Sequence, residues 1–457
     1  MKSLVRFITQ NGGQVCNIGY PTRILKGKFS ESNITCVWYR DNLILNSRLI
    51  NYVKLFQSPK FKPIDSINNS QTYIFTEDGF TSLNIISKFG KDNKIYDIKE
   101  VDYSKYDTVN SYYKGLEDCR LVVWNNKLYA YGTRWDKIQD RGCICLYELN
   151  DMFKPEKEIV IKPQFDNKCE KNWAAVCDKP FTFVYSHNPL IVVKVNDNGD
   201  CNVIKRNEIN DELRDTIKGS TQIVRYDENM YVSLVHTNNY YTDGDINHYD
   251  YLTAFVFYDN DLNIIKISDW FVFNSPMCEF TCGLVVNGDD VYITYSQLDC
   301  TSELIVTNKE TIEKFMNSSN DASNNYSFID YYALAKKYEN DAKYLSSTSL
   351  YNYAACIFDK YESIPIEFNI ECVIKTYSNI IKRAPEYIKK DFYKEFIDSL
   401  SIWINKHPNC CEFYYLTAIL YKLSQDYDNY EKYKQMGDER KLNIHRYFFK
   451  YFNPNYL

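Results

Sequence analysis

The stretch Asn125-Asn-Lys-Leu-Tyr-Ala-Tyr-Gly-Thr-Arg134 begins with a turn, continues as an aromatic-rich strand and ends in a basic residue. Paired asparagines favour a turn, and alternation of side-chain character favours a strand. Four further segments have the same order of turn, aromatic-rich strand and polar end: Asp41–Arg48, Asp178–Asn188, Asp227–Thr237 and Gly288–Asp299. The last four of the five copies begin about 50 to 60 residues apart, close to the blade spacing of β-propellers. Five copies therefore predict a five-bladed β-propeller.

The polar ends of these copies are expected to lie at one end of the central channel. In a propeller the blades surround a central channel, so equivalent strands end on the same side. The residues expected to converge there are Arg48, Arg134, His187, His236 and Asp299. A two-sheet sandwich is the competing architecture, but such a domain typically needs only about 100 residues. The repeats extend over a much longer region, which favours the propeller.

The hydrophobic period changes near residue 327. Before this point apolar and polar residues alternate, as in strands, whereas later segments have apolar residues at helical spacing. The stretch from Asn317 to Asn325 has the polar composition of a linker. We therefore predict a propeller over residues 1–310, a linker over 311–326 and an α-helical domain over 327–457.

The predicted helices of the second domain cover 326–345, 350–361, 367–383, 385–405 and 411–423. Pro385 suits the first turn of a helix, and His407-Pro408 suits a helix end. Segments around Tyr353 and Tyr414 faintly resemble helices of tetratricopeptide repeats. The domain is expected either to cover one side of the propeller or to bind a protein partner or a second copy.

Composition limits the function classes. Hydrophobic residues make up 45% and charged residues 25%, as in soluble globular proteins. The net charge of −6 and the lack of a long basic run argue against nucleic-acid binding. The 15 cysteines form no Cys-x-x-Cys pair, so no metal site is expected. We also expect the protein to be in a reducing compartment. No apolar run approaches the ~18 residues of a membrane helix, so the predicted location is cytoplasmic.

Gly115-Leu-Glu-Asp-Cys-Arg120 places two carboxylates and an arginine at the start of a predicted strand. Neighbouring strand residues point to opposite faces, so only one of Glu117 and Asp118 is expected to enter a given site. The other would then hold the arginine or a backbone group. A solvated turn is the alternative, because acidic residues are mostly exposed.

Several segments, taken in order, resemble glycoside hydrolase family 130, the five-bladed β-mannoside phosphorylases and their transferase relatives. The resemblance covers roughly residues 28–305 and not the helical half. It rests on Ser32-Asn33 with Asn46-Ser-Arg48, Gly115–Arg120, Glu170-Lys-Asn-Trp173, Tyr185-Ser-His-Asn-Pro189, Gly219-Ser-Thr with Val235-His236, and Cys282-Gly-Leu284 with Tyr295–Asp299.

The resemblance implies a role for each matching residue. Asp118 matches the general acid, which Glu117 and Arg120 would brace. The residues implied or expected to contact sugar are Asn33, Arg48, Arg120, Arg134, Asn172, Trp173 and Asp299. The residues implied to form a phosphate or donor site are Lys171, His187 and His236. Cys119 replaces the proline of the family motif, and Asn188 replaces a cationic phosphate ligand. An activated sugar donor is therefore an alternative to phosphate.

The chemistry of the residue types permits more than one reaction. An inverting hydrolase needs a second carboxylate about 6.5–9.5 Å from the acid, for which Glu170 and Glu279 are candidates. A phosphorylase or transferase needs cations to bind an anionic group, and this half supplies several. Trp173, Tyr185 and Tyr240 are candidates to stack on sugar rings, and a place in the blade core is the equal alternative for Trp173.

We therefore predict a carbohydrate-active enzyme that performs inverting glycosyl transfer, of mannose by the resemblance, as a glycosyltransferase or a glycoside phosphorylase. No cofactor is expected beyond phosphate or an activated sugar donor as co-substrate. Two alternatives remain open: a hydrolase of the same fold, and a catalytically silent glycan-binding propeller whose helical domain recruits a partner.

Overall fold

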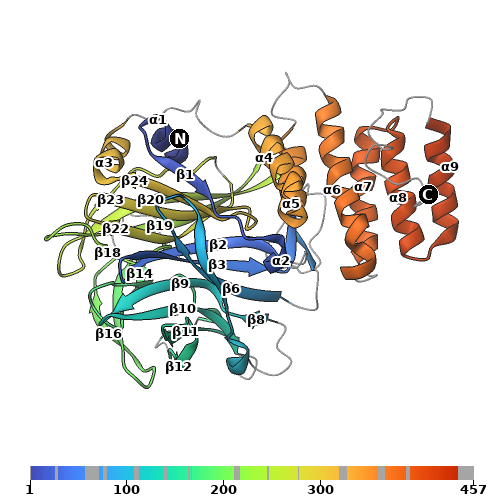
Figure 1. Ribbon diagram of the computed structural model, residues 1–457. Coiled ribbons are helices and arrows are strands. Elements are labelled where there is room, and N and C mark those ends of the chain that lie inside the picture. Colours follow the sequence, from blue (N-terminus) through green and yellow to red (C-terminus); the bar gives the residue numbers. More distant parts are fainter. Residues whose placement is uncertain are drawn as a thin grey trace.

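The computed structural model describes residues 2–25, 29–56, 71–75, 80–107, 113–136, 141–162, 165, 167–209, 217–243, 246–275, 277–318, 327–358, 366–387 and 392–440. Within these residues the chain forms five antiparallel blades followed by a row of helices (Figure 1). The predicted fold class is confirmed.

Blade 1 contains β2 (Ser30–Tyr39), β3 (Asn42–Ile50), β6 (Phe80–Phe89) and β7 (Ile95–Val101), with β8 (Tyr113–Gly115) paired to β6. Blade 2 contains β9 (Glu117–Trp124), β10 (Lys127–Asp136), β11 (Arg141–Leu149) and β12 (Pro155–Val160). Blade 3 contains β13 (Ala174–Ala175), β14 (Thr182–His187), β15 (Leu190–Val195) and β16 (Cys201–Arg206). A separate hairpin joins β4 (Tyr52–Phe56) to β5 (Gln71–Phe75).

Blade 4 contains β17 (Lys218–Gly219) and β18 (Val224–Arg225), which both pair with β19 (Tyr231–Asp243), then β20 (Ile246–Tyr258) and β21 (Ile264–Ile267). Blade 5 contains β22 (Glu279–Asn287), β23 (Asp290–Gln297), β24 (Glu303–Asn308) and β1 (Gln14–Asn17). The first strand of the chain therefore completes the last blade, and this pairing closes the ring (Figure 1).

The five sequence copies occupy equivalent places. Each copy ends in the second strand of its blade: β3, β10, β14, β19 and β23. Near the axis, Gln222 Nε2 donates to the backbone oxygens of Cys36 in blade 1 and Leu284 in blade 5, at 2.7 and 2.9 Å. A buried polar side chain thus ties blades 1, 4 and 5 together and fills part of the central channel.

Two short helices flank the closure of the ring. Ser3 caps α1 (Leu4–Gln10), and Asn308 caps α3 (Lys309–Asn317), with each side chain accepting a backbone N–H. Phe7 and Phe315 join the two helices with ring centroids 5.3 Å apart. The predicted linker therefore starts too early, because residues 311–317 are helical; residues 319–326 lie outside the described residues. A third short helix, α2 (Thr22–Leu25), precedes blade 1.

The helical domain consists, where it is described, of α4 (Phe328–Asn340), α5 (Tyr344–Ile357), α6 (Ile366–Tyr387), α7 (Phe392–Lys406), α8 (Cys411–Leu423) and α9 (Tyr427–Arg440). Pro385 lies near the end of α6 and not in the first turn of a new helix, so this prediction is wrong. The end of α7 before His407-Pro408 agrees with the predicted stop. Helix α9 was not predicted, since its sequence is mostly polar.

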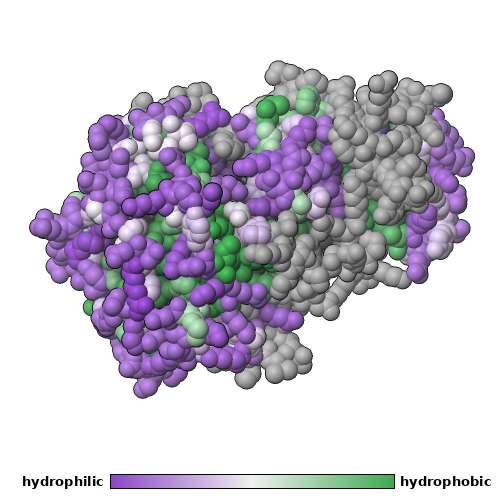
Figure 2. Space-filling model, in the orientation of Figure 1, coloured by the Kyte–Doolittle hydropathy of each residue, from purple (hydrophilic) through white to green (hydrophobic). Residues whose placement is uncertain are grey.

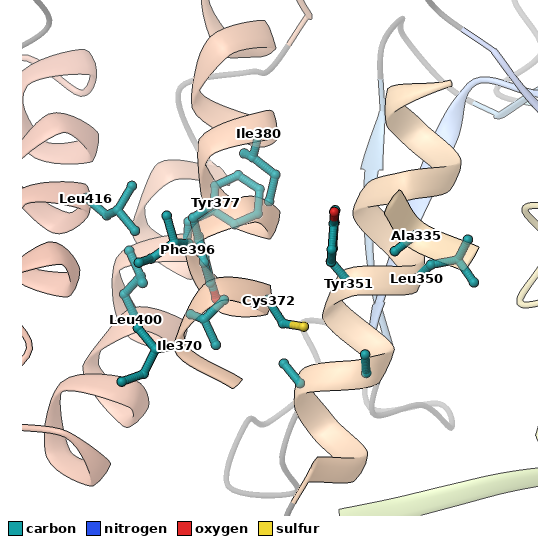
Figure 3. Packing of buried hydrophobic residues seen from close by; sticks show 14 of the residues in the cluster. Ala335, Leu350, Tyr351, Ile370, Cys372, Tyr377, Ile380, Phe396, Leu400 and Leu416 are labelled. Carbon is teal, nitrogen blue, oxygen red and sulfur yellow. The ribbon is translucent and has the colours of Figure 1, made fainter. Parts of the chain in front are cut away.

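Apolar side chains hold the helices together and attach them to the propeller. Figure 3 shows Tyr377, Phe396 and Leu416 in the cluster between α6, α7 and α8. The same cluster includes Met277 and Leu298 of the propeller. The helical domain is therefore packed against blade 5, while hydrophilic residues cover most of the propeller face in Figure 2. No described helix has both the length and the hydropathy needed to cross a membrane.

Candidate functional site

A β-bulge at Asp118 defines the centre of the candidate site. Glu117 pairs with Thr133 and Arg120 pairs with Tyr131, so Asp118 and Cys119 together face one residue of β10. Asp118 has φ +50°, a left-handed backbone conformation that aspartate tolerates better than most residues. The facing residue is Gly132, where a Cβ would lie 2.5 Å from the backbone oxygen of Glu117. Bulges of this kind redirect side chains beside active sites.

The bulge brings both carboxylates to the same arginine. Arg48 lies 2.9 Å from Asp118 Oδ1 and 3.8 Å from Glu117 Oε1. The prediction that only one of the two carboxylates enters the site is therefore wrong. Strict alternation of faces requires a regular strand, and the left-handed residue at position 118 interrupts it.

Asp118 is held by two donors on one oxygen. Arg48 Nη1 and Asn33 Nδ2 donate to Oδ1 at 2.9 and 2.7 Å. Among the described side chains none donates to Oδ2, and 15% of the Asp118 side chain is exposed. Burial raises the pKa of Asp118, but Arg48, Lys171, Arg120 and the Asn33 hydrogen bond outweigh it, so the pKa lies below its ordinary value. Asp118 is thus an ionised carboxylate whose two oxygens differ, because the described side-chain donors all bind Oδ1.

Asn33 is placed by a second bulge. The register of β2 against β3 shifts between Ser32 and Ile34, which leaves Asn33 as the extra residue. Its Oδ1 accepts a hydrogen bond from Ser296 Oγ at 2.6 Å, which fixes the amide so that Nδ2 faces Asp118. Blades 1, 2 and 5 therefore each contribute one residue to this hydrogen-bonded chain.

Arg48 is the central cation of the site. Its Nε donates to Ser82 Oγ at 2.8 Å, and its side chain is only 6% exposed. Burial lowers the pKa of Arg48, but electrostatic interaction with Tyr52, Glu117, Asp118 and Asp299 raises it above its ordinary value. Asp299 is therefore within electrostatic range of Arg48. Its backbone, like that of Asp118, is left-handed, with φ +51°.

Two lysines extend the site toward blades 3 and 4. Lys171 Nζ lies 2.9 Å from Glu117 Oε1, and this carboxylate is the main reason that the pKa of Lys171 is raised. Lys218, on β17, has a lowered pKa because of burial and the nearby charge of Lys171. The charge of Lys171 is thus felt at Lys218, while Lys171 itself is paired with Glu117.

His187 ends β14, whereas His236 lies in the middle of β19, and both side chains are buried. Burial lowers the pKa of His187 to about 4, and burial together with Lys218 and Arg120 lowers that of His236 well below its ordinary value. His187 Nε2 pairs with the Tyr258 hydroxyl at 2.9 Å. Desolvation opposes protonation of both imidazoles, so among Lys171, His187 and His236 the positive charge expected at a phosphate or donor site comes from Lys171.

His236 and Arg120 meet at one residue. His236 Nδ1 is 2.7 Å from Ser220 Oγ, and Arg120 Nε donates to the Ser220 backbone oxygen at 2.7 Å. Arg120 Nη2 also donates to Asn172 Oδ1 at 3.2 Å. Arg120 thus links blades 2, 3 and 4 and influences Asp118 through charge alone. The direct bracing role predicted for Arg120 belongs to Arg48 and Asn33.

Two predicted sugar-binding residues lie outside this cluster. Arg134 Nη2 pairs with Glu158 on β12 at 3.1 Å, so its charge is already matched away from Asp118. Trp173 is fully buried, and its Nε1 donates to Glu170 Oε2 at 3.0 Å. Trp173 belongs to the core of blades 2 and 3 and has no exposed face for a sugar. Tyr185 packs edge-on against Trp173, and the Tyr240 side chain lies outside the described residues.

The candidate hydrolytic bases have structural partners. Glu279 accepts backbone N–H groups of Phe273, Asn274 and Ser275 at 2.6 to 3.2 Å, although burial raises its pKa to about 8. Glu170 is 1% exposed and accepts the Trp173 indole. Both carboxylates are buried and have structural hydrogen bonds, although Glu170 Oε1 has no hydrogen-bond partner among the described residues.

Several site residues were missed in the sequence. Ser82 and Ser296 orient Arg48 and Asn33, and Lys218 interacts electrostatically with Lys171. The rings of Tyr113 and Trp135 are tilted against each other, with centroids 5.0 Å apart. Ser296 could have been found, since it belongs to the copy that ends at Asp299. The others come from strands outside the repeat. No described group of three His, Cys, Asp or Glu side chains is arranged to bind a metal.

Similar folds occur among mannoside-active enzymes. The β-1,2-mannobiose phosphorylase of Listeria innocua is 12% identical and matches 66% of this chain and 99% of its own, with a TM-score of 0.44. A GDP-Man-dependent mannosyltransferase of Leishmania mexicana is 11% identical and matches 68% and 94%, with a TM-score of 0.43. A mannose phosphorylase of the same organism is 13% identical and matches 65% and 89%, with a TM-score of 0.39.

No family model matches the chain, and no curated protein matches it. Identities this low accompany a shared fold with many reactions, so the chemistry has to be derived from the residues of this site.

Proposed function

We propose that the protein catalyses inverting glycosyl transfer, of a mannose-like sugar, with Asp118 as the general acid/base. The observation that carries this proposal is the unshared oxygen of Asp118. Its partner oxygen is fixed by Asn33 and Arg48. A carboxylate that is rigidly oriented, ionised and accessible at one atom can accept a proton from a hydroxyl group in the transition state.

The lowered pKa of Asp118 favours the synthetic direction. In that direction an acceptor hydroxyl oxygen forms the new bond to the anomeric carbon while the bond to the leaving group breaks. Asp118 takes the hydroxyl proton, and the leaving group departs with the bonding electrons as an anion. In the reverse direction the protonated Asp118 returns the proton to the glycosidic oxygen, directly or through a sugar hydroxyl.

Lys171 and Lys218 are the groups that would stabilise the departing anion. Burial and, second, the charge of Lys171 lower the pKa of Lys218. Charge-assisted contacts from the two ammonium groups would stabilise a phosphate leaving group. The neutral histidines can still donate a hydrogen bond but add no charge.

An exposed tyrosine and a half-buried tryptophan would supply apolar surface for the sugar. Tyr113, 38% exposed, precedes Glu117 by four residues, and Trp135 follows the residue paired with Glu117 by two. Aromatic rings combine apolar faces with polar tips, which suits the two-sided chemistry of sugars. The pair therefore lies where an acceptor sugar bound at Asp118 would extend.

A silent glycan-binding propeller is the second candidate, and one observation favours it. The Lys171–Glu117 ion pair neutralises one of the two lysines. If that pair persists with ligand bound, the site retains too little positive charge for an anionic donor. Neutral glycans would then be the ligands.

The two candidates separate in one assay. Purified protein is incubated with mannose 1-phosphate or GDP-mannose and with mono- or oligosaccharide acceptors, and released phosphate or nucleotide is measured. Donor-dependent release with a new glycoside supports transfer. Glycan binding by calorimetry without release, and without binding of phosphate or either donor, supports the silent propeller.

A further inference from the structure

A buried ion pair joins the helical domain to the strand that carries Asn33. Lys343, at the start of α5, lies 2.8 Å from Glu31 Oε1 on β2, and the two side chains are 7% and 1% exposed. The Tyr20 backbone N–H donates to the same oxygen at 3.0 Å. Removing one member of such a pair is strongly destabilising, because the other charge remains buried.

The ion pair is two residues from the bulge of β2. At the next residue, the backbone oxygen of Ser32 accepts a hydrogen bond from Ser302 Oγ at 2.9 Å. Asn33 then leaves the regular register and donates to Asp118 at 2.7 Å. The segment that presents Asn33 is therefore anchored from the helical domain at Glu31 and from blade 5 at Ser32.

Other charged groups near Lys343 do not replace it. Glu303 and Lys337 act electrostatically in the same interface, and burial raises the pKa of Glu303 to about 7. Asn17 binds both Glu303 Oε1 and the Tyr338 hydroxyl. Among the described residues, Lys343 is the cation in direct contact with Glu31.

We propose that Lys343 is a positioning residue: through Glu31 the helical domain fixes the β2 bulge that orients Asn33 toward Asp118. The helical domain would then help to position residues of the site. The structural part of this inference stands on the contacts alone, whereas its catalytic consequence rests on the proposed function.

Hydrogen–deuterium exchange tests the structural part without any assay of activity. The variant Lys343→Met is compared with two controls. Lys375→Met breaks a similarly buried lysine pair, to Glu339 at 2.7 Å, wholly within the helical domain. Tyr331→Phe removes hydroxyl contacts to Ser275 and Met277 in the same domain interface but away from β2.

We expect Lys343→Met to speed exchange in peptides covering residues 30–36 by about tenfold or more, and the two controls to leave these peptides unchanged. The double variant Glu31→Gln/Lys343→Met buries no unpaired charge, so its melting temperature should recover while exchange at 30–36 stays fast. Unchanged exchange in Lys343→Met, or equal acceleration in both controls, overturns the proposal.

The catalytic consequence has a separate readout. Loss of the Asn33 hydrogen bond raises the pKa of Asp118, so the acidic limb of the pH–rate profile should move to higher pH in Lys343→Met. If the wild-type protein transfers no sugar, the proposed function fails, but the exchange measurement still decides the positioning role. If transfer occurs and the acidic limb stays in place, the catalytic part of the inference is wrong.

Discussion

Arg48 and Asp118 form a 2.9 Å ion pair between the second strand of blade 1 and the first strand of blade 2. The two residues are 70 positions apart in the chain. Their contact exists because a bulge turns Asp118 toward the arginine and a second bulge turns Asn33 toward the same oxygen. The candidate site is thus built at the junction of blades.

Asp118→Asn should abolish most transfer while leaving the fold intact. The amide has the size of the carboxylate but cannot accept the acceptor proton, and general acid–base help is typically worth about 10²–10⁴-fold. We expect turnover to fall by that factor with little change in acceptor binding by calorimetry. Wild-type turnover in this variant would place the catalytic group elsewhere.

Arg48→Met should be among the most destabilising single changes. It leaves Asp118 buried beside Glu117 without its main cation, and such losses cost about 3–5 kcal/mol. The pKa of Asp118 is lowered in the folded protein, so its ionisation stabilises the fold above its unfolded pKa, and this stability is lost as pH falls through the folded value.

Chemical denaturation at neutral and acidic pH tests this prediction. The wild-type free energy of unfolding should decrease toward acid partly through Asp118, whereas Arg48→Met should lack that part. Arg40→Met, which breaks an exposed pair with Asp151, is the control and should change stability by less than about 1 kcal/mol. Equal effects of the two variants would contradict the assigned role.

The histidines should remain neutral in the folded protein between pH 5 and 8. His187 has a pKa of about 4, against about 6.5 in the unfolded chain. The unfolded state therefore binds more protons in this window, so stability contributed by neutral His187 is present above about pH 6.5 and is lost toward pH 4. Imidazole chemical shifts followed by NMR should show no titration of His187 or His236 near pH 6.5. A titration midpoint near pH 6.5 for either histidine would contradict this prediction.

Gly132→Ala should disturb the Asp118 bulge. The new Cβ would lie 2.5 Å from the Glu117 backbone oxygen and 3.2 Å from Cys119 Cα, so backbone has to shift. We expect the free energy of unfolding to fall by about 1–3 kcal/mol, as for other overpacking changes. Turnover should also fall, because the bulge orients Asp118. Gly288→Ala is the control, since a Cβ there meets nothing within 4 Å although its φ is +62°. Normal activity of Gly132→Ala would show that the bulge geometry is not required.

Much of the architecture could be read from the sequence. The five copies, from Asp41–Arg48 to Gly288–Asp299, predicted five blades because each blade repeats the same turn and strand pattern. The change of hydrophobic period likewise predicted the helical half. Local patterns were sufficient here, since turns and periodicity are properties of neighbouring residues.

Which candidate residues are buried and which carry charge depended on tertiary structure. Trp173 was a candidate to stack on a sugar by residue type, and the two histidines were assigned to a phosphate or donor site by the resemblance. In the folded chain burial makes Trp173 core and lowers the pKa of both histidines. Alternation of side chains between the two faces failed at Asp118 because the strand has a bulge there. The bulge depends on the partner strand, in which Gly132 faces it. Lys343 met Glu31 only because a helix packed against the propeller. Desolvation, strand register and domain packing are set by residues distant in sequence, so only the folded chain could decide them.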